Sequence, residues 1–136
     1  MNDCYFCQTV AGNSDMSVIG EISSERFIFA WDHNPVTPGH ALVIPKRHVQ
    51  FMKDLNESER AELIENVLML KSYITSANLQ VIYTNLVARI EDENSKNFVN
   101  DALQALSAHK TPPNAFNDGL NDGPAAGQTV PHFHWH

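Results

Sequence analysis

The sequence ends in Pro131-His132-Phe133-His134-Trp135-His136, a run in which imidazole and aromatic side chains alternate. An alternation with a period of two predicts an extended strand, because successive side chains of a strand point to opposite faces. The three histidines therefore share one face, and Phe133 and Trp135 share the other. Three adjacent imidazoles that titrate near neutrality suit a metal site or a phosphoryl-transfer site better than a core-facing strand.

The loop before this run, NDGPAAGQTV at residues 121–130, is rich in turn-forming residues. Backbone N–H groups in such turns can form a concave anion site, and we expect the amides around Ala126 and Gly127 to do so. Gly127 also permits a close approach that a side chain would block. The loop and the histidine run together indicate a site for an anionic group such as a phosphate.

Length and composition bound the class of protein. The chain has 136 residues, 43% apolar and 18% charged, which is typical of one globular domain spanning residues 1–136. The net charge is −7 at pH 7 and no basic stripe is visible, which disfavours nucleic-acid binding. A small anionic ligand is still compatible with this charge, because a local site can be positive within an acidic protein.

The sequence contains no signal for membranes or secretion. No segment approaches the roughly 18–20 consecutive apolar residues of a membrane span. The N-terminus has neither a basic start nor an apolar run, so we expect no secretory signal. We therefore expect a cytoplasmic protein that does not act in a membrane.

Cys4 and Cys7 are the two cysteines of the chain. In a cytoplasmic protein this spacing indicates metal or redox chemistry rather than a structural disulfide. A redox pair of the thioredoxin type would follow a strand, and no strand can precede Cys4. Two thiolates fill half of a tetrahedral zinc site, so histidines would have to complete it. Without such partners the cysteines would simply begin a short helix.

Apolar periodicity and turn residues predict the elements of the first third of the chain. Two prolines and a glycine interrupt the pattern before His40, and Pro45 ends the strand that follows. The predicted elements are a short helix at 4–12, strands at 17–22, 26–31 and 40–45, a turn at 23–25 and a loop at 32–39.

The middle of the chain is predicted to be a long helical region over about residues 57–109, with Asn56 or Ser58 as the N-cap. Leu63, Val67, Leu70 and Ile74 recur at the spacing of one buried helical stripe. A second stretch runs from about Gln80 to His109, and the polar patch at 91–97 can divide it. With residues 114–119 extended, the order predicts an α+β fold, an antiparallel meander sheet with helices packed on one face.

Three segments together resemble the histidine triad family. They are NPVTPGH at 34–40, LVIPKRH at 42–48, and the loop and histidine run at 121–136. The initial CYFC at 4–7 is similar to the zinc-binding bacterial variety of that family. The resemblance covers residues 4–50 and 114–136, and the helical region between them is longer than the resemblance implies.

The resemblance implies nucleotide binding and transfer or hydrolysis at an α-phosphate. Members of the family form homodimers and act on nucleoside phosphoramidates, dinucleoside polyphosphates or nucleotidyl-sugars. By position, the nucleophile is the middle histidine, His134. His136 then lies near the phosphate or the leaving group, and His40 lies beside the triad. From its residue type alone, His40 could equally be a buried strand histidine bonded to backbone.

The chemistry of imidazole agrees with this role for His134. A neutral imidazole attacks phosphorus well, and a covalent intermediate divides one displacement into two easier steps. The attacking nitrogen must be unprotonated, so the other ring nitrogen should donate to a fixed acceptor such as a backbone carbonyl.

Five residues are expected to bind the substrate: Asp32, Asn121, Gly127, Gln128 and Thr129. The resemblance places Asp32 on the ribose hydroxyls and Asn121 on phosphate or ribose, while Gln128 and Thr129 can donate to an α-phosphate. The plain alternatives are a turn-capping role for Asp32 and ordinary loop hydrogen bonds for Gln128 and Thr129. His33 stands where the family usually has an aliphatic residue against the base, which leaves the base preference open.

The resemblance also completes the metal hypothesis. In zinc-bearing relatives, the two cysteines are joined by the histidine after the Pro-Lys-Arg exit and by the first histidine of the triad. The resulting set has the closed Cys₂His₂ composition of a structural zinc site, with no position left for a reactive water. It consists of Cys4, Cys7, His48 and His132.

The sequence stops at His136, whereas relatives continue with a few apolar residues, a proline and often a basic residue. Either this sequence is an incomplete version of the gene product, or a terminal carboxylate weakens activity toward an anion, or another segment covers the end.

Three hypotheses of function follow. The leading one is a nucleotide hydrolase or transferase that uses His134. The alternative is a zinc-stabilised nucleotide-binding or dimerisation module with little catalysis. A third, redox exchange through Cys4 and Cys7, requires ready thiol cycling with no metal present.

Overall fold

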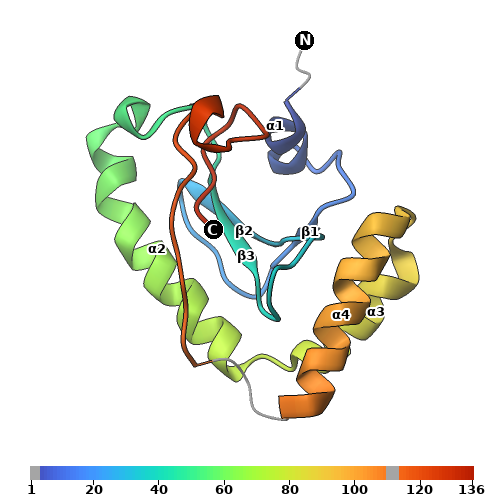
Figure 1. Cartoon of the computed structure of the whole chain (residues 1–136). Coiled ribbons are helices and arrows are strands. Elements are labelled where there is room, and N and C mark those ends of the chain that lie inside the picture. The colour runs from blue at the N-terminus through green and yellow to red at the C-terminus, as the bar shows by residue number, and fades with distance from the viewer. Residues whose placement is uncertain (1–3, 110–113) are drawn as a thin grey trace.

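Three short strands form an antiparallel sheet at the centre of the computed structural model, which describes residues 4–109 and 114–136 (Figure 1). The strand order is β1-β2-β3. β2 pairs with β3 along its whole length, from Phe27 opposite Pro45 to Trp31 opposite Ala41. The strands are β1 (Ser17–Val18), β2 (Phe27–Trp31) and β3 (Ala41–Pro45).

The histidine run lies along the outer edge of β3. Trp135 exchanges two backbone hydrogen bonds with Val43, each of 2.9 Å, and the Phe133 N–H donates to the Val49 carbonyl at 2.6 Å. The predicted continuous strand is not formed, because Trp135 makes only isolated bridges, to Val43 and to Leu120. The alternation of faces is nevertheless present, since Phe133 belongs to the main apolar core and His132 and His134 contact α1 on the other side.

The segment that enters the loop is extended, as expected for 114–119, but it forms no regular strand. Gly119 and His136 exchange backbone hydrogen bonds of 3.1 and 2.8 Å. The terminal segment is therefore paired on both sides, by β3 and by residues 119–120.

Alternate side chains of the sheet face two apolar clusters. On one face, Phe27, Phe29 and Val43 pack with helical residues in the larger cluster. On the other face, Leu42 and Ile44 pack against Phe6 of α1 (Tyr5–Val10). Burial on both faces explains why β3 is a run of apolar residues rather than an alternating one.

Helix α2 (Glu57–Ser76) begins where the sequence predicts. Asn56 accepts from the Glu59 N–H and the Glu59 side chain accepts from the Asn56 N–H, which makes a complete capping box. Glu59 is buried and pairs with Arg47 at 2.7 Å, so the box also ties α2 to the end of β3. The predicted stripe of Leu63, Val67, Leu70 and Ile74 is buried in the core.

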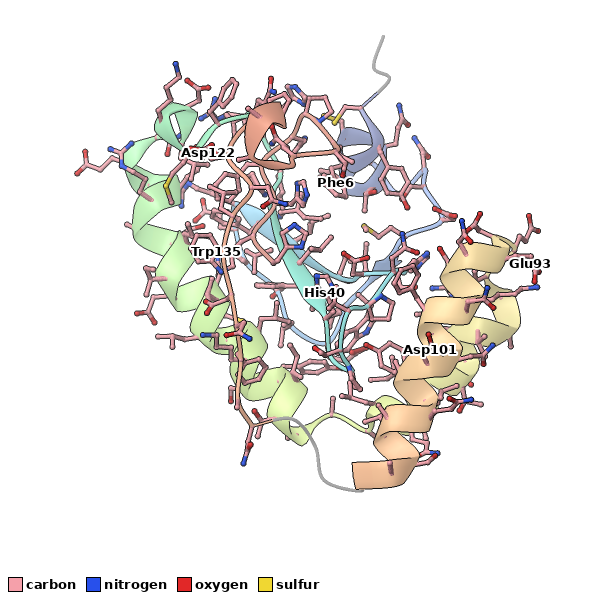
Figure 2. All side chains as sticks on the ribbon, viewed as in Figure 1. Phe6, His40, Glu93, Asp101, Asp122 and Trp135 are labelled. Carbon is pink, nitrogen blue, oxygen red and sulfur yellow. The ribbon has the colours of Figure 1, made fainter. Side chains whose placement is uncertain are left out.

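The rest of the helical region is a hairpin of α3 (Leu79–Arg89) and α4 (Glu93–His109). The break lies at residues 90–92, at the start of the polar patch that was predicted to divide the region. Figure 1 shows α2 on one side of the sheet and the α3–α4 hairpin at the other. Figure 2 shows Phe6 and Trp135 inside the molecule, whereas Glu93 and Asp101 lie on its outer surface.

The α+β meander with packed helices is thus confirmed, with two differences of detail. The strand predicted at 17–22 is limited to Ser17–Val18, because the chain leaves the sheet beyond Ile19. The short helix α1 covers the face opposite to α2. The remaining elements are two 3₁₀ turns, η1 (Met52–Asp54) and η2 (Pro124–Ala126). Within the described ranges, no helix combines the length and apolar character needed to cross a bilayer.

We predict that Phe133→Ala destabilises the fold by about 3–5 kcal/mol, because it leaves a large cavity at a side chain that is fully buried. Val81→Ala, at a side chain that is 52% exposed, should cost less than about 1 kcal/mol. Denaturant unfolding of both variants measures the difference, and equal losses would show that the histidine run does not pack as described.

Candidate functional site

His134 is held by a hydrogen bond that fixes the position of its proton. Its Nδ1 lies 2.8 Å from the carbonyl oxygen of His132, and a carbonyl only accepts, so Nδ1 carries the hydrogen. Nε2 is then the unprotonated nitrogen of the neutral ring. Burial lowers the pKa of His134 below its ordinary value, which favours this neutral form.

Phe6 covers His134 and was not singled out by the sequence. The two ring centroids are 4.8 Å apart in an edge-on arrangement, and Phe6 also contacts His132 at 5.8 Å. A residue between two cysteines gives no sign of this role, because the partner of a helical side chain depends on tertiary packing. Phe6 excludes water from one side of the His134 ring and contributes to the lowered pKa.

His136 and His40 lie side by side, with 3.0 Å between His136 Nδ1 and His40 Nε2. The backbone N–H of Val36 donates to His40 Nδ1 at 3.2 Å, so the neutral His40 ring carries its proton on Nε2. His136 Nδ1 then accepts a hydrogen bond from His40 Nε2–H, so the proton of the neutral His136 ring is on Nε2. That atom is buried and has no partner among the described residues.

Asp32 stands next to His40. One carboxylate oxygen lies 3.5 Å from His40 Nε2, and the other accepts the N–H of Asn34 at 2.8 Å. Asp32, His40 and His136 are close enough to hold a metal ion. The proton on His40 Nε2 favours a hydrogen-bonded cluster instead. A metal bound at Nε2 would move that proton to Nδ1, where it would point at the Val36 N–H, and two donors would then face each other.

The loop before the histidine run uses most of its own donors. Gly123 and Gly127 adopt φ values of 102° and 97°, which favour glycine. The amides of Ala126 and Gly127 donate within the turn, at 3.1 and 3.0 Å, so the expected anion concavity is not formed by them. The side chain of Asn121 packs under Gly127 and donates to its carbonyl at 3.5 Å.

Gln128 and Thr129 differ in how they are placed. The buried Gln128 side chain donates to the Gln50 carbonyl at 3.0 Å and accepts from the Gln50 side chain at 3.3 Å. Gln128 therefore joins the loop to the segment after β3. Thr129 is exposed and follows directly, so its hydroxyl is accessible to a ligand.

Cys4, Cys7, His48 and His132 converge from α1, the segment after β3 and the histidine run. Sγ of Cys7 lies 3.2 Å from His48 Nδ1 and 3.5 Å from His132 Nδ1, and Cys4 Sγ lies 3.3 Å from His132 Nδ1. A tetrahedral zinc ion with bonds of about 2.0–2.3 Å separates its ligand atoms by roughly 3.5 Å. The spacing of the four atoms fits such an ion.

The tautomer of His132 supports the same fit. Its Nε2 lies 2.8 Å from the Pro45 carbonyl and must donate, which leaves the Nδ1 lone pair toward the two thiols. Burial lowers the pKa of His132, so the ring is neutral as a metal ligand requires. The residues present therefore fit a metal ion in their spacing and in the tautomer of His132.

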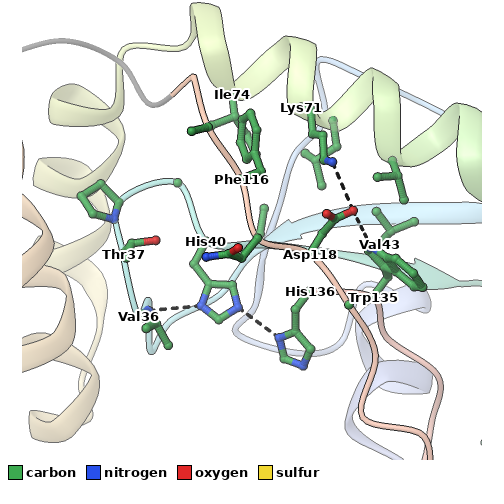
Figure 3. A pocket seen from close by; sticks show the side chains of 18 of the residues that line it. Val36, Thr37, His40, Val43, Lys71, Ile74, Phe116, Asp118, Trp135 and His136 are labelled. Atoms are coloured by element: carbon green, nitrogen blue, oxygen red, sulfur yellow. Dashed lines mark hydrogen bonds and ion pairs between the residues drawn. The ribbon is translucent and has the colours of Figure 1, made fainter.

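A cavity of about 1100 Å³ borders the site (Figure 3). It lies between α2, the segment 114–121 and the loop before β3, and His40 and His136 form part of its wall. His134, Gln128 and Thr129 do not line it. The cavity thus meets the site at the His40–His136 pair and extends on the α2 side of the histidine run.

Comparison with known proteins places these features in a family. A family model described as the HIT domain matches residues 12–136. The chain is similar to a bis(5'-nucleosyl)-tetraphosphatase (asymmetrical) of Schizosaccharomyces pombe, with 33% identity over 102 residues, which are 75% of this chain and 38% of that protein. It is also similar to an adenosine 5'-monophosphoramidase of Mus musculus, with 30% identity over 67 residues, which are 49% of this chain and 40% of that protein. The chain thus spans less than half the length of either relative.

Among solved structures, the chain is similar to a zinc-bound histidine triad family protein from Mycobacterium smegmatis. The TM-score is 0.59 with 28% identity, over 98% of this chain and 72% of that one.

Proposed function

The chain belongs to the HIT domain family, whose model matches residues 12–136, and we propose that it is a hydrolase or transferase that acts at the α-phosphate of a nucleotide. The observation that carries this proposal is the fixed tautomer of His134. Its Nδ1 donates to the His132 carbonyl, so the lone pair of Nε2 is available for attack on phosphorus.

The proposed reaction has two displacements. His134 Nε2 attacks the α-phosphorus, forms a P–N bond and expels the leaving group. The Nε2–H of His136 has no other partner among the described residues, so it can donate a hydrogen bond to a phosphate oxygen, while the leaving atom takes its proton from solvent water. Water then attacks the same phosphorus and gives a proton to solvent, which breaks the P–N bond and releases a nucleoside monophosphate and neutral His134.

His40 holds His136 in the required tautomer, because its Nε2–H faces His136 Nδ1. We therefore assign His134 and His136 to the chemistry and His40 to their support. Burial lowers the pKa of His136, so the ring enters the reaction neutral, with one N–H that can donate a hydrogen bond.

We assign contacts with the substrate to Asp32, Asn121 and Thr129, and we assign the shape of the substrate-binding loop to Gly127 and Gln128. Asp32 is near His40 and can accept ribose hydroxyls, and Thr129 is exposed at the start of the histidine run. Gln128 contributes by holding the loop through Gln50. The proposed substrates are adenosine-containing phosphoramidates or dinucleoside polyphosphates, in line with the names of the two relatives.

We predict that brief mixing with an adenosine 5'-phosphoramidate or a diadenosine polyphosphate adds one nucleotidyl group to the wild-type chain, because Nε2 of His134 forms a P–N bond before water attacks. Intact-protein mass spectrometry after a quench without acid measures the adduct. His134→Ala and His134→Asn should both lack it, and Asn keeps a donor toward the His132 carbonyl. An adduct of equal amount in both variants would show that His134 is not the nucleophile.

A second function is favoured by one observation. The amides of Ala126 and Gly127 and the side-chain donor of Gln128 are engaged within the protein, which leaves few donors for a developing phosphoryl charge. A zinc-stabilised nucleotide-binding or dimerisation module with little catalysis would bind adenosine monophosphate without releasing product. Burst-phase turnover at an enzymatic rate excludes this alternative.

We propose that Cys4, Cys7, His48 and His132 bind one structural zinc ion. The zinc would join α1 to the histidine run beside His134, and its four protein ligands would leave no site for a reactive water. Zinc thiolates also agree with a location in the reducing cytoplasm.

We predict one zinc ion per wild-type chain and none in Cys7→Ser, because a ligand is lost. At free zinc about 1,000 times its Kd, binding contributes about 4 kcal/mol to stability, and a chelator should remove that contribution. Metal analysis and thermal unfolding measure both effects. His40→Ala serves as the control, since His40 belongs to the other cluster, and loss of zinc in that variant would contradict the assignment.

We propose that the chain forms a homodimer through the outer face of α2. Ile64 and Leu68 are 59% and 54% exposed and lie one helical turn apart on that helix. Such large apolar side chains on one surface are typical of a protein contact.

Leu68→Asp should therefore give a monomer in sedimentation velocity, because a charge would be buried in the contact. Val81→Asp, on the exposed face of α3, should leave the oligomeric state unchanged. A wild-type monomer at tens of micromolar protein would refute the dimer.

A further inference from the structure

The loop at residues 33–39 connects Asp32 to His40, the two residues that face His136. Its ends are joined by a backbone hydrogen bond of 3.0 Å from the Asp32 N–H to the His40 carbonyl. Between them the chain makes no regular structure, and Gly39 has a φ of 90°. The positions of both site residues therefore depend on what holds this loop.

Tyr83 of α3 holds one end of the loop. Its hydroxyl accepts the N–H of Gly39 at 2.8 Å, in a fully buried contact. The same ring packs edge-on against Trp31, with centroids 6.5 Å apart. Trp31 precedes Asp32 and Gly39 precedes His40, so one side chain contacts the neighbour of each site residue.

Ser95 of α4 holds the other end. Its hydroxyl donates to the side-chain oxygen of Asn34 at 2.7 Å, and its own N–H donates to Asp92 at the start of the helix. The N–H of Asn34 in turn donates to the Asp32 carboxylate at 2.8 Å. A short chain of hydrogen bonds therefore leads from α4 to Asp32.

The contacts continue from the loop to the histidine run. The other Asp32 oxygen lies 3.5 Å from His40 Nε2, which lies 3.0 Å from His136 Nδ1. The Val36 N–H, in the middle of the loop, sets the tautomer of His40. A shift of the loop would therefore change both the position of His40 and the proton that it offers to His136.

We infer that Tyr83 is a positioning residue, and that the α3–α4 hairpin holds Asp32 and His40 in register with His136 through Tyr83 and Ser95. This inference rests on the proposed function for its effect on catalysis. It gives the long helical region a role in the site.

The Tyr83 hydroxyl suits this task because it stays in its neutral form. Burial raises the pKa of Tyr83 to about 12, so no charge forms beside the loop near neutral pH. Removing the hydroxyl leaves the Gly39 N–H buried without an acceptor among the described residues. A buried donor without a partner is destabilising, so we expect the loop to shift until this N–H is hydrogen-bonded again. A misplacement of about 1 Å at a reacting group can lower a rate about 100-fold.

The test compares Tyr83→Phe with Tyr73→Phe. Tyr73 also packs against Trp31, with centroids 6.2 Å apart, but its hydroxyl donates to Glu21 at the surface. The two variants lose the same atom from neighbouring rings, and only one loses a contact with the loop. Thermal unfolding of both checks that each is folded.

We expect Tyr83→Phe to lower kcat about 10- to 100-fold and to raise KM by a smaller factor, because His40 shifts against His136 and Asp32 shifts against the ribose. Ser95→Ala should show a smaller loss of the same kind, and Tyr73→Phe should stay within about twofold of wild type. A kcat for Tyr83→Phe equal to that of Tyr73→Phe would overturn the inference.

The inference stays testable if the wild-type protein proves inactive, which would refute the proposed function alone. The His40 and His136 ring signals in long-range ¹H–¹⁵N spectra then measure the tautomer populations of the two rings directly. We expect Tyr83→Phe to change the tautomer populations of both rings and Tyr73→Phe to change neither. Unchanged spectra in Tyr83→Phe would overturn the inference.

Discussion

The backbone pairing of the histidine run with Val43 and Val49 is the constraint on which the rest of the site depends. Phe133 and Trp135 are fixed by these bonds, so the residues between them must present their side chains to the opposite face. Phe133 is buried in the main core, which opposes any slip by one residue, because a slip would remove it from that core and place an imidazole there instead. The carbonyl of His132 then has a fixed place, and it orients His134.

The histidine run contributes side chains to two sites, and each site contacts different residues of the segment 4–7. His132 faces Cys4 and Cys7, whereas His134, one pleat further on, faces Phe6. Cys4 and Cys7 share one side of the first helical turn, and Phe6 points elsewhere. A metal bound by the cysteines would therefore fix α1, and α1 would in turn keep Phe6 against His134. The four proposed metal ligands and the proposed nucleophile, His134, are therefore coupled through the packing of α1.

Much of the site could be predicted from the sequence, because it depends on local patterns. The period of two separated His134 from Phe133, and Asn56, one of the two N-caps expected, is the N-cap of α2. The four proposed metal ligands came from the family resemblance, and the structure brings them together.

Features that depend on tertiary partners could not be predicted. Gln128 was expected to face a phosphate, but its partner Gln50 lies 78 positions away in the sequence. The amides of Ala126 and Gly127 are used by the 3₁₀ turn, whose hydrogen bonds a glycine-rich composition does not reveal. The contacts of Tyr83 and Ser95 with the loop likewise join residues more than 40 positions apart.

Without substrate, the fold presents an unprotonated His134 Nε2 and a protonated Nδ1, because Nδ1 faces the His132 carbonyl. Long-range ¹H–¹⁵N spectra of the ring nitrogens at neutral pH test it most directly. We predict that Nδ1 of His134 shows a directly bonded proton and that Nε2 shows the shift of an unprotonated nitrogen. A ring protonated on Nε2, or on both nitrogens, would contradict the claim, because no lone pair would then be available for attack on phosphorus.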